Sequence, residues 1–145
     1  MDTRGFTAER YAIAKPAGFE SERGDCAVRA LMVGTGIEYS AAHALLKRHG
    51  RIDREGTFNQ QMERAALELG AEFFPFEGNY KPGSTTVNQF VKAHPRGAFI
   101  LRIRAHYLAV IDGTVHNWRP IKRAYVMRVW KCNQGFSSKA GRNRP

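Results

Sequence analysis

Cysteine, long apolar runs and, in the second part of the chain, acidic residues are all scarce in this sequence. Its two cysteines, Cys26 and Cys132, cannot build a disulfide framework and offer too little thiolate for a zinc site. No apolar run approaches the roughly 20 residues that a membrane-spanning helix needs. The first residues, MDTRGFTAERYAIAKP, lack the apolar core and the cleavage site of a secretory signal. We therefore expect a cytoplasmic protein with no signal peptide, no membrane partner, no metal ion and no cofactor.

Size and composition predict one globular domain. The chain has 145 residues, of which 43% are hydrophobic and 25% charged, close to the average of folded proteins. We place the domain at residues 1–132 and treat residues 1–19 as an N-terminal arm. Residues 133–145, NQGFSSKAGRNRP, are rich in glycine, serine, asparagine and arginine, and predict a flexible basic tail.

Positive charge is concentrated in the C-terminal part of the chain. Lysine and arginine number 23 against 13 aspartates and glutamates, a formal net charge of +10. Residues 92–145 contain 12 of these basic residues and a single acid, Asp112. A one-sided positive surface attracts nucleic acid or an acidic protein partner. The alternative interpretation is a solvated basic face that only aids solubility.

Four stretches carry helix signals. Asp25 is a good N-cap for a short helix over Cys26–Val33, which Gly34 and Gly36 are expected to stop. Ser40 is the expected cap of a second helix and Thr57 of a third. The segment TTVNQFVKAHP predicts a fourth helix, bounded by its proline. The expected apolar stripe of the third helix consists of Phe58, Met62, Ala65, Ala66 and Leu69.

The strand signals lie almost entirely in the second part of the chain. AEFFPF predicts a short strand interrupted by Pro75, and four longer stretches follow. Asp112-Gly113 between two strand-like runs is a strong hairpin signal. The order of helices first and an antiparallel sheet afterwards predicts an α+β fold. The four stretches are GAFILRIRA, HYLAVIDG, TVHNW and AYVMRVWK.

Cys26 is the first candidate for chemistry, because it occupies the first position of a predicted helix. The helix dipole and the free backbone N–H groups at that position favour a thiolate and lower the pKa of a cysteine. The same N–H groups can stabilise an oxyanion that forms during attack on a carbonyl. The simpler alternative is a small buried residue that covers a helix end. Cys132 has no base nearby in the sequence and is interpreted as structural.

His106 is the candidate general base, since a histidine that opens a strand can project beyond the edge of the sheet. Histidine is the most frequent base for a cysteine nucleophile. An ordinary half-exposed strand histidine is the commoner case. The remaining histidines, His43, His49, His94 and His116, are weaker candidates.

Asn117 follows His106 by eleven residues, across the Asp112-Gly113 turn. Pairing around that turn brings Asn117 back towards His106. An amide there can accept a hydrogen bond from the imidazole, fix its tautomer and orient the ring. Asp112 is the competing orienting group, but it lies in the turn, at the far end of the strand from His106. We therefore favour Asn117.

Two motifs resemble papain-like cysteine peptidases, in particular small peptidase-C39-like and bacteriophage-encoded proteins of that superfamily. GDCAVRAL opens a helix at residues 24–31, and HYLAVIDGxVxN at residues 106–117 precedes a final strand. The resemblance covers roughly residues 20–131. It implies a papain-like α+β fold, with a helical first half packed on a C-terminal antiparallel sheet. It also implies a peptide or protein substrate, and a host cytoplasm or virion location if the protein is phage-encoded.

The same resemblance implies roles for three residues: a thiolate at Cys26, a general base at His106 and an orienting residue at Asn117. One departure concerns the oxyanion hole, to which papain-like enzymes usually contribute a glutamine several residues before the nucleophile. Glu20 has a similar length, but its carboxylate would repel an oxyanion, and Ser21 or Arg23 could donate instead. Losing one donor costs on the order of 2.7–4 kcal/mol in the transition state.

Two functions follow from these observations. The first is a thiol hydrolase that cleaves a peptide or isopeptide bond through an acyl-enzyme on Cys26, supported by the helix cap Asp25. The second is a weak or inactive papain-fold binding or virion structural protein that uses its basic C-terminal half. Trp118 and Trp130 lie among cations in that half, a pattern that suits single-stranded nucleic acid, although we favour core tryptophans beside solvent-facing cations.

Overall fold

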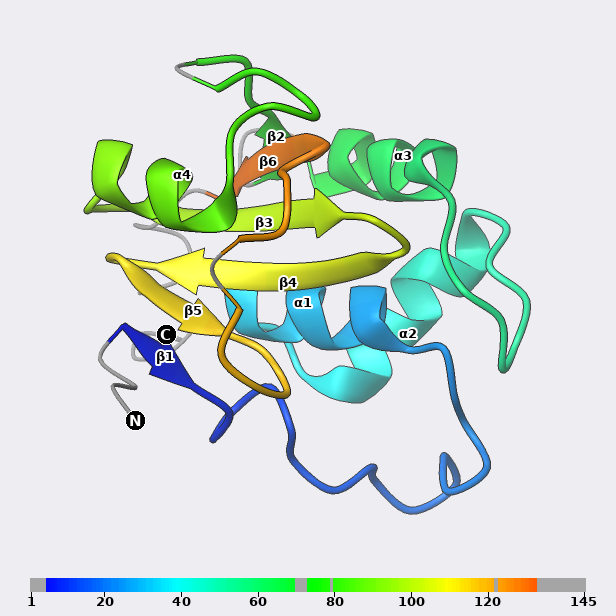
Figure 1. Cartoon of the computed structure of the whole chain (residues 1–145). Helices are drawn as coiled ribbons and strands as arrows, with labels where there is room; N and C mark the ends of the chain where they lie inside the picture. Colours follow the sequence, from blue (N-terminus) through cyan, green and yellow to red (C-terminus); the bar gives the residue numbers. More distant parts are fainter. Residues whose placement is uncertain (1–4, 70–72, 79, 122, 133–145) are drawn as a thin grey trace, which may run out of the picture.

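The structure, a computed structural model, describes residues 5–69, 73–78, 80–121 and 123–132 and has an α+β fold (Figure 1). Three helices precede most of the strands, as predicted. The elements in chain order are β1 (Phe6–Thr7), α1 (Cys26–Thr35), α2 (Tyr39–Arg48), α3 (Asn59–Leu69), β2 (Phe73–Pro75), α4 (Val87–Ala93), β3 (Ala98–Ile103), β4 (His106–Ile111), β5 (Thr114–His116) and β6 (Arg128–Cys132).

The strands form one six-stranded sheet in the order β1-β5-β4-β3-β6-β2. The expectation of an antiparallel sheet is wrong at one edge, where β1 pairs with β5 in parallel. The N-terminal arm supplies this strand, and a chain that approaches the edge from outside the hairpin is free to pair in either direction. The other edge is β2, which ends with Pro75. An edge position tolerates the proline, because its missing N–H is not needed by a further strand.

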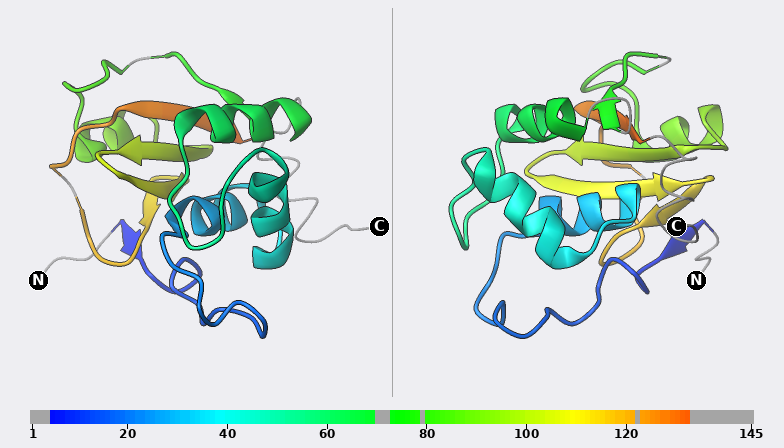
Figure 2. Two further views of the ribbon diagram at one scale, coloured as in Figure 1. Left: turned by 90° about the vertical axis from the view of Figure 1, so that its right-hand side faces the viewer. Right: turned by 180° about the vertical axis from the view of Figure 1, so that it is seen from behind.

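Side chains that alternate along the strands form a core on each face of the sheet. On one face α1, α2 and α3 pack against residues such as Ile100, Ala109 and Trp130. On the other face α4 packs against residues such as Phe99 and Leu108. Figures 1 and 2 show α1 and α2 on the opposite side of the sheet from α4. The period of two along β3 and β4 thus divides the apolar residues between two layers.

Helix α1 runs two residues further than predicted, because Gly34 does not stop it. Gly36 ends the helix in a left-handed conformation, with φ of 83°, and its N–H donates to the carbonyl of Met32. Gly34 instead allows α1 to lie close to the sheet. A Cβ atom at this position would come within 2.8 Å of Cγ1 of Ile100 and 3.2 Å of the sulfur of Cys132.

The predicted N-caps of α2 and α3 are both wrong. Glu38 occupies the N-cap position of α2, so the prediction of Ser40 is wrong by two residues. The hydroxyl of Thr57 is buried and has no hydrogen-bond partner among the described residues, so it does not cap α3. Phe58 is 69% exposed and leaves the predicted apolar stripe, whereas Met62 is buried.

The predicted fourth helix is confirmed as α4, and the structure adds a capping box at its start that was not predicted. The hydroxyl of Thr86 accepts a hydrogen bond from the backbone N–H of Gln89, whose side chain in turn accepts from the N–H of Thr86. This reciprocal pair is a capping box. The helix ends at Ala93, two residues before Pro95.

The predicted hairpin is confirmed. Asp112 and Gly113 both have positive φ, 47° and 82°, as a two-residue turn of this twist requires. Val110 pairs with Val115 across the turn. The last predicted strand, AYVMRVWK, is partly wrong, because β6 begins only at Arg128.

The predicted basic tail, residues 133–145, lies outside the described residues. Within the part of the chain that the structure describes, no helix has the length and apolar character needed to cross a bilayer.

Candidate active site

Two of the three predicted catalytic residues open elements whose starting ends lie side by side. Cys26 opens α1 and His106 opens β4, and both views of the ribbon place these ends next to each other (Figures 1 and 2). The hydroxyl of Tyr11 connects them. It donates to the carbonyl of Tyr107 at 2.6 Å, and lies 3.4 Å from the carbonyl of Cys26 and 3.5 Å from Nε2 of His106. Residues eighty positions apart in the chain therefore meet at one place.

His106 and Asn117 form a short hydrogen bond. Nε2 of the imidazole lies 2.6 Å from Oδ1 of Asn117. The hairpin register explains this pairing, because Ala109 is opposite His116, which places Asn117 just beyond the end of β5 and diagonal to His106. The predicted orienting residue is thus in contact with the imidazole. Asp112 lies in the turn and accepts the N–H of Gly97 instead.

The hydrogen bonds of Asn117 determine which nitrogen of His106 carries the proton. Nδ2 of Asn117 donates to the carbonyl of Arg119 at 3.2 Å, so Oδ1 faces the imidazole and accepts its proton. Nε2 of the neutral ring is therefore the protonated nitrogen, and Nδ1 keeps the lone pair of a base. Burial lowers the pKa of His106, the hydrogen bond to Asn117 raises it and the charge of Arg119 lowers it further, with a net decrease.

Cys26 is partly buried, and its thiol is less acidic than predicted. Burial raises its pKa, and the charge of Asp25 adds to this effect, whereas hydrogen bonds from the N–H groups of Tyr107 and Ala27 oppose it. The effect of desolvation on the pKa of Cys26 outweighs that of the helix N-terminus, so the expectation of a lowered pKa is wrong for the free protein. Among the described residues, no hydrogen bond joins the sulfur to the imidazole of His106. The backbone contact with Tyr107 nevertheless brings the sulfur to the residue adjacent to His106.

Asp25 lies at the predicted N-cap position, but its side chain does not cap α1. Its carboxylate pairs with Nε of Arg29 at 3.1 Å and accepts a hydrogen bond from the hydroxyl of Tyr39 at 2.7 Å. Arg29 also donates to the carbonyls of Tyr11 and Ile13. Asp25 therefore supports the site indirectly, because it holds the arginine that fixes the N-terminal arm against α1.

The residues expected to complete an oxyanion hole do not reach the site. Glu20 is exposed, and its carboxylate accepts the N–H of Gly18. Ser21 is exposed and lines a different pocket, which also contains His43. Arg23 is exposed, and none of the three contacts Cys26, His106 or Asn117 through a hydrogen bond or ion pair among the described residues. The turns between residues 16 and 24 direct these side chains to solvent.

Tyr11 is the residue of this site that the sequence did not reveal. It is fully buried, although it belongs to the arm, which shows no apolar period. Its ring also packs edge-on against Trp118, with centroids 5.2 Å apart. Burial is the main reason that the pKa of Tyr11 is raised, with contributions from the charges of Cys26 and Asp25, so the hydroxyl remains a donor. Only the closure of the arm over α1 and β4 creates this contact.

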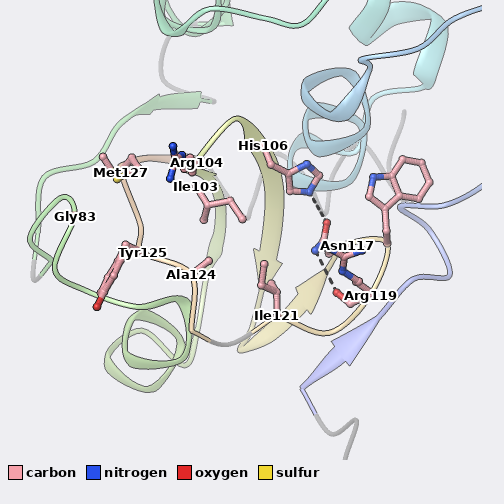
Figure 3. Close-up of a pocket in the computed structure, with 11 residues that line it drawn as sticks. Gly83, Ile103, Arg104, His106, Asn117, Arg119, Ile121, Ala124, Tyr125 and Met127 are labelled. Carbon is pink, nitrogen blue, oxygen red and sulfur yellow. Dashed lines mark hydrogen bonds between the residues drawn. The ribbon is translucent and has the colours of Figure 1, made fainter.

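A cleft of about 890 Å³ begins at His106 and Asn117 (Figure 3). Its lining is largely apolar and includes Trp118, which is 47% exposed, so the expectation that this tryptophan is a core residue is wrong. Trp130, in contrast, is fully buried, as predicted. The other lining residues are Gly83, Ile103, Arg104, Arg119, Ile121, Ala124, Tyr125 and Met127.

One group of side chains away from this cleft has the composition of a metal site. Single ligand atoms of Glu22, His43 and Asp53 lie within 4.8 Å of one another. Glu22 already accepts hydrogen bonds from Arg51 at 2.8 Å, from His43 at 2.7 Å and from the N–H of Arg54 at 2.7 Å. These partners satisfy the carboxylate of Glu22, so we interpret the cluster as an ion-pair network that joins the segment before α1 to α2.

Comparisons of this chain with protein-family models, with curated proteins and with solved structures found no match.

Proposed function

We propose that this protein is a thiol hydrolase that cleaves a peptide or isopeptide bond through an acyl-enzyme on Cys26. The observation that carries the proposal is the meeting of the Cys26 end of α1 with a His106–Asn117 pair bonded at 2.6 Å. The order cysteine, histidine, asparagine along the chain is similar to that of papain-like cysteine peptidases. In this proposal Cys26 is the nucleophile, His106 the general base and Asn117 the residue that orients the base.

Acylation and deacylation each need one proton transfer to Nδ1 of His106 and one from it. Nδ1 of His106 takes the thiol proton as the sulfur of Cys26 attacks the carbonyl carbon and a C–S bond forms. The C–N bond then breaks, the amine leaves with the proton from Nδ1, and an acyl thioester remains. A water molecule gives its proton to the same nitrogen, attacks the thioester and releases the acid, which restores the thiol.

The raised pKa of Cys26 fits an enzyme whose thiol stays protonated at rest and passes its proton to His106 as the sulfur attacks. A neutral thiol beside a neutral imidazole avoids two buried charges in the free protein. The imidazolium that forms with the thiolate is held by its hydrogen bond to Asn117. Because the candidate donors Ser21 and Arg23 are exposed to solvent and Glu20 cannot donate, backbone N–H groups at the start of α1 are the remaining oxyanion donors. We expect a slow enzyme as a result.

Thiol labelling tests the proposal directly. Iodoacetamide should label Cys26 but not Cys132, which is fully buried. His106→Ala should slow the labelling of Cys26 by about tenfold or more near neutral pH, since base catalysis of this kind contributes about 10²-fold or more. Cys132→Ala is the matched control and should label like the wild type. Equal labelling rates with and without His106, no faster than those of free cysteine, would exclude a functional pair.

A second candidate function is binding without catalysis, as an inactive papain-fold or virion structural protein. The observation that favours it is the raised pKa of Cys26 together with exposed arginines around the cleft. Nucleic-acid binding is the form most easily tested. Its affinity should fall steeply as salt increases, because phosphate contacts release counterions. A salt-independent affinity, or no binding at low salt, would eliminate that form of the function.

A further inference from the structure

The cleft beside His106 gathers exposed apolar side chains. Trp118, Tyr125 and Met127 are 47%, 53% and 44% exposed, and all three line it. Ile121 adds to its apolar lining. A soluble protein rarely leaves several large apolar residues exposed in one hollow, and such patches mark binding sites. A volume of about 890 Å³ exceeds what one side chain fills, so the cleft has room for a short stretch of chain.

Two arginines border the same cleft. Arg104 and Arg119 are exposed, and within the described residues neither guanidinium takes part in a hydrogen bond or an ion pair. Figure 3 shows Arg104 beside Met127 at one side and Arg119 beside Asn117 at the other, with Ile121 between them. Among the residues that the structure describes, no acidic side chain lines the cleft. Guanidinium groups suit carboxylates, to which they can donate two parallel hydrogen bonds.

We infer that the cleft binds a short peptide in which a bulky apolar residue stands between two acidic residues. The apolar side chain fills the space among Trp118, Tyr125 and Met127, and the two carboxylates pair with Arg104 and Arg119. This inference rests on the proposed hydrolase and names its substrate class. Arg119 is close enough to His106 for its charge to lower the pKa of the imidazole, so a carboxylate bound to Arg119 lies next to the base.

Peptide binding tests this inference without any chemistry at the thiol. Cys26→Ala protein is titrated against fluorescein-labelled heptapeptides whose central residues are Glu-Phe-Glu, Gln-Phe-Gln or Glu-Ala-Glu. The first peptide should bind about tenfold more tightly than either of the others, because one comparison removes both carboxylate pairs and the other removes the buried ring. Equal affinity for all three peptides would overturn the inference.

Charge variants separate the cleft from the general positive charge of the protein. Arg104→Gln combined with Arg119→Gln should abolish the preference for Glu-Phe-Glu over Gln-Phe-Gln and keep the preference for phenylalanine over alanine. Arg96→Gln is the control, since Arg96 is exposed and does not line the cleft. The inference fails if Arg96→Gln reduces the preference for Glu-Phe-Glu over Gln-Phe-Gln by as much per removed charge as the double variant does. It also fails if an oligothymidylate displaces the peptide and binds more tightly. Either result would mean that the cleft is a general polyanion surface.

The experiments distinguish a failure of the hydrolase proposal from a failure of the proposed peptide cleft. Selective peptide binding in a protein whose Cys26 labels independently of His106 keeps the peptide cleft and rejects the hydrolase. Cleavage of peptides by the wild-type protein with no preference for flanking acids keeps the hydrolase and rejects this substrate class.

Discussion

Charged side chains differ in burial and pairing between two regions of the molecule. One is the side that contains α1, α2 and α3, here called the helical side, and the other is the cleft beside His106. On the helical side two of the ion pairs are buried: Glu22 with Arg51 at 2.8 Å and Asp25 with Arg29 at 3.1 Å. Around the cleft, Arg104 and Arg119 are exposed and have no acidic partner among the described residues.

The contrast distinguishes charges that hold the fold from charges that remain available to a ligand. A buried pair is desolvated, and each member needs the other. An exposed arginine beside apolar surface gains its strongest partner only when a ligand brings a carboxylate and excludes water. His106 and Asn117 lie where the two regions meet. Strand β4 has α1, α2 and α3 on one face of the sheet, and its first residue, His106, lines the cleft.

Removing the cation of a buried pair should give the largest loss of stability. Arg51→Met leaves the carboxylate of Glu22 buried with one fewer partner, and we expect a loss of about 3–5 kcal/mol in the free energy of unfolding. Urea unfolding followed by tryptophan fluorescence measures it. Arg48→Met, at an exposed pair with Glu68, is the control and should have a much smaller effect. Similar losses in both variants would remove the distinction between buried and exposed pairs.

Acid should destabilise the protein through a histidine that lacks a carboxylate. His43 has Glu22 at 2.7 Å, but the buried Nδ1 of His116 has no hydrogen-bond partner among the described residues. Burial, followed by the charge of Arg10, lowers the pKa of His116 to about 4. The unfolded chain therefore binds a proton first, and stability that is complete above about pH 6.5 falls by about 3 kcal/mol as the pH approaches 4.

His116→Gln isolates this contribution. The carboxylates titrate in both proteins, so the difference between the two unfolding free energies at pH 7 and at pH 4.5 reports His116 alone. We expect the loss between these two pH values to be smaller in His116→Gln than in the wild type. An identical loss would mean that His116 finds a partner for its proton.

Variants of Asn117 test the site where the two regions meet, through their effect on the labelling of Cys26. Asn117→Ala removes the acceptor of the proton on Nε2 of His106, so the ring loses its fixed tautomer, and labelling of Cys26 should slow by about tenfold. Asn117→Asp supplies a negative charge instead, which should raise the pKa of His106 and move the pH profile of labelling upwards. An unchanged profile in both variants would show that Asn117 does not act through His106.

The smallest effect on stability is expected at the cleft. Arg104→Gln combined with Arg119→Gln should change the free energy of unfolding by no more than about 0.5 kcal/mol, because neither side chain holds another part of the fold. Urea unfolding under the conditions used for Arg51→Met gives the comparison. A loss of stability similar to that of Arg51→Met would mean that these arginines are structural.

Local signals predicted the elements that depend on neighbours in the chain. The turn at Asp112-Gly113 sets the register of β4 and β5, and this register is sufficient to bring Asn117 to His106. The capping box at Thr86 also involves residues only three apart, although the sequence analysis did not name it. Gly34 shows the limit of such signals. A glycine near the end of a predicted helix resembles a stop signal, and only the structure shows that this glycine allows α1 to pack closely against the sheet.

Partners that lie far apart in the chain escaped the sequence analysis. Asp25 has the position of a cap, yet Arg29 and Tyr39 compete successfully for its carboxylate. Cys26 has the position of an activated thiol, yet burial against β4 raises its pKa. Arg29 lies only four residues from Asp25, but Tyr39 belongs to α2, and the burial of Cys26 comes from β4. The strength of these interactions depends on desolvation that only packing produces.

The sequence by itself determined the order of helices and strands, the hairpin with its histidine and asparagine, and the excess of cations near the C-terminal end. These features depend on turn chemistry, periodicity and composition, all of which act over a few residues. Only the tertiary structure decided that Tyr11 closes over Cys26 and His106, that Glu22 is buried with Arg51, and that Arg104 and Arg119 border an apolar cleft. Burial and charge pairing depend on which distant surfaces meet, and no short stretch of sequence contains that information.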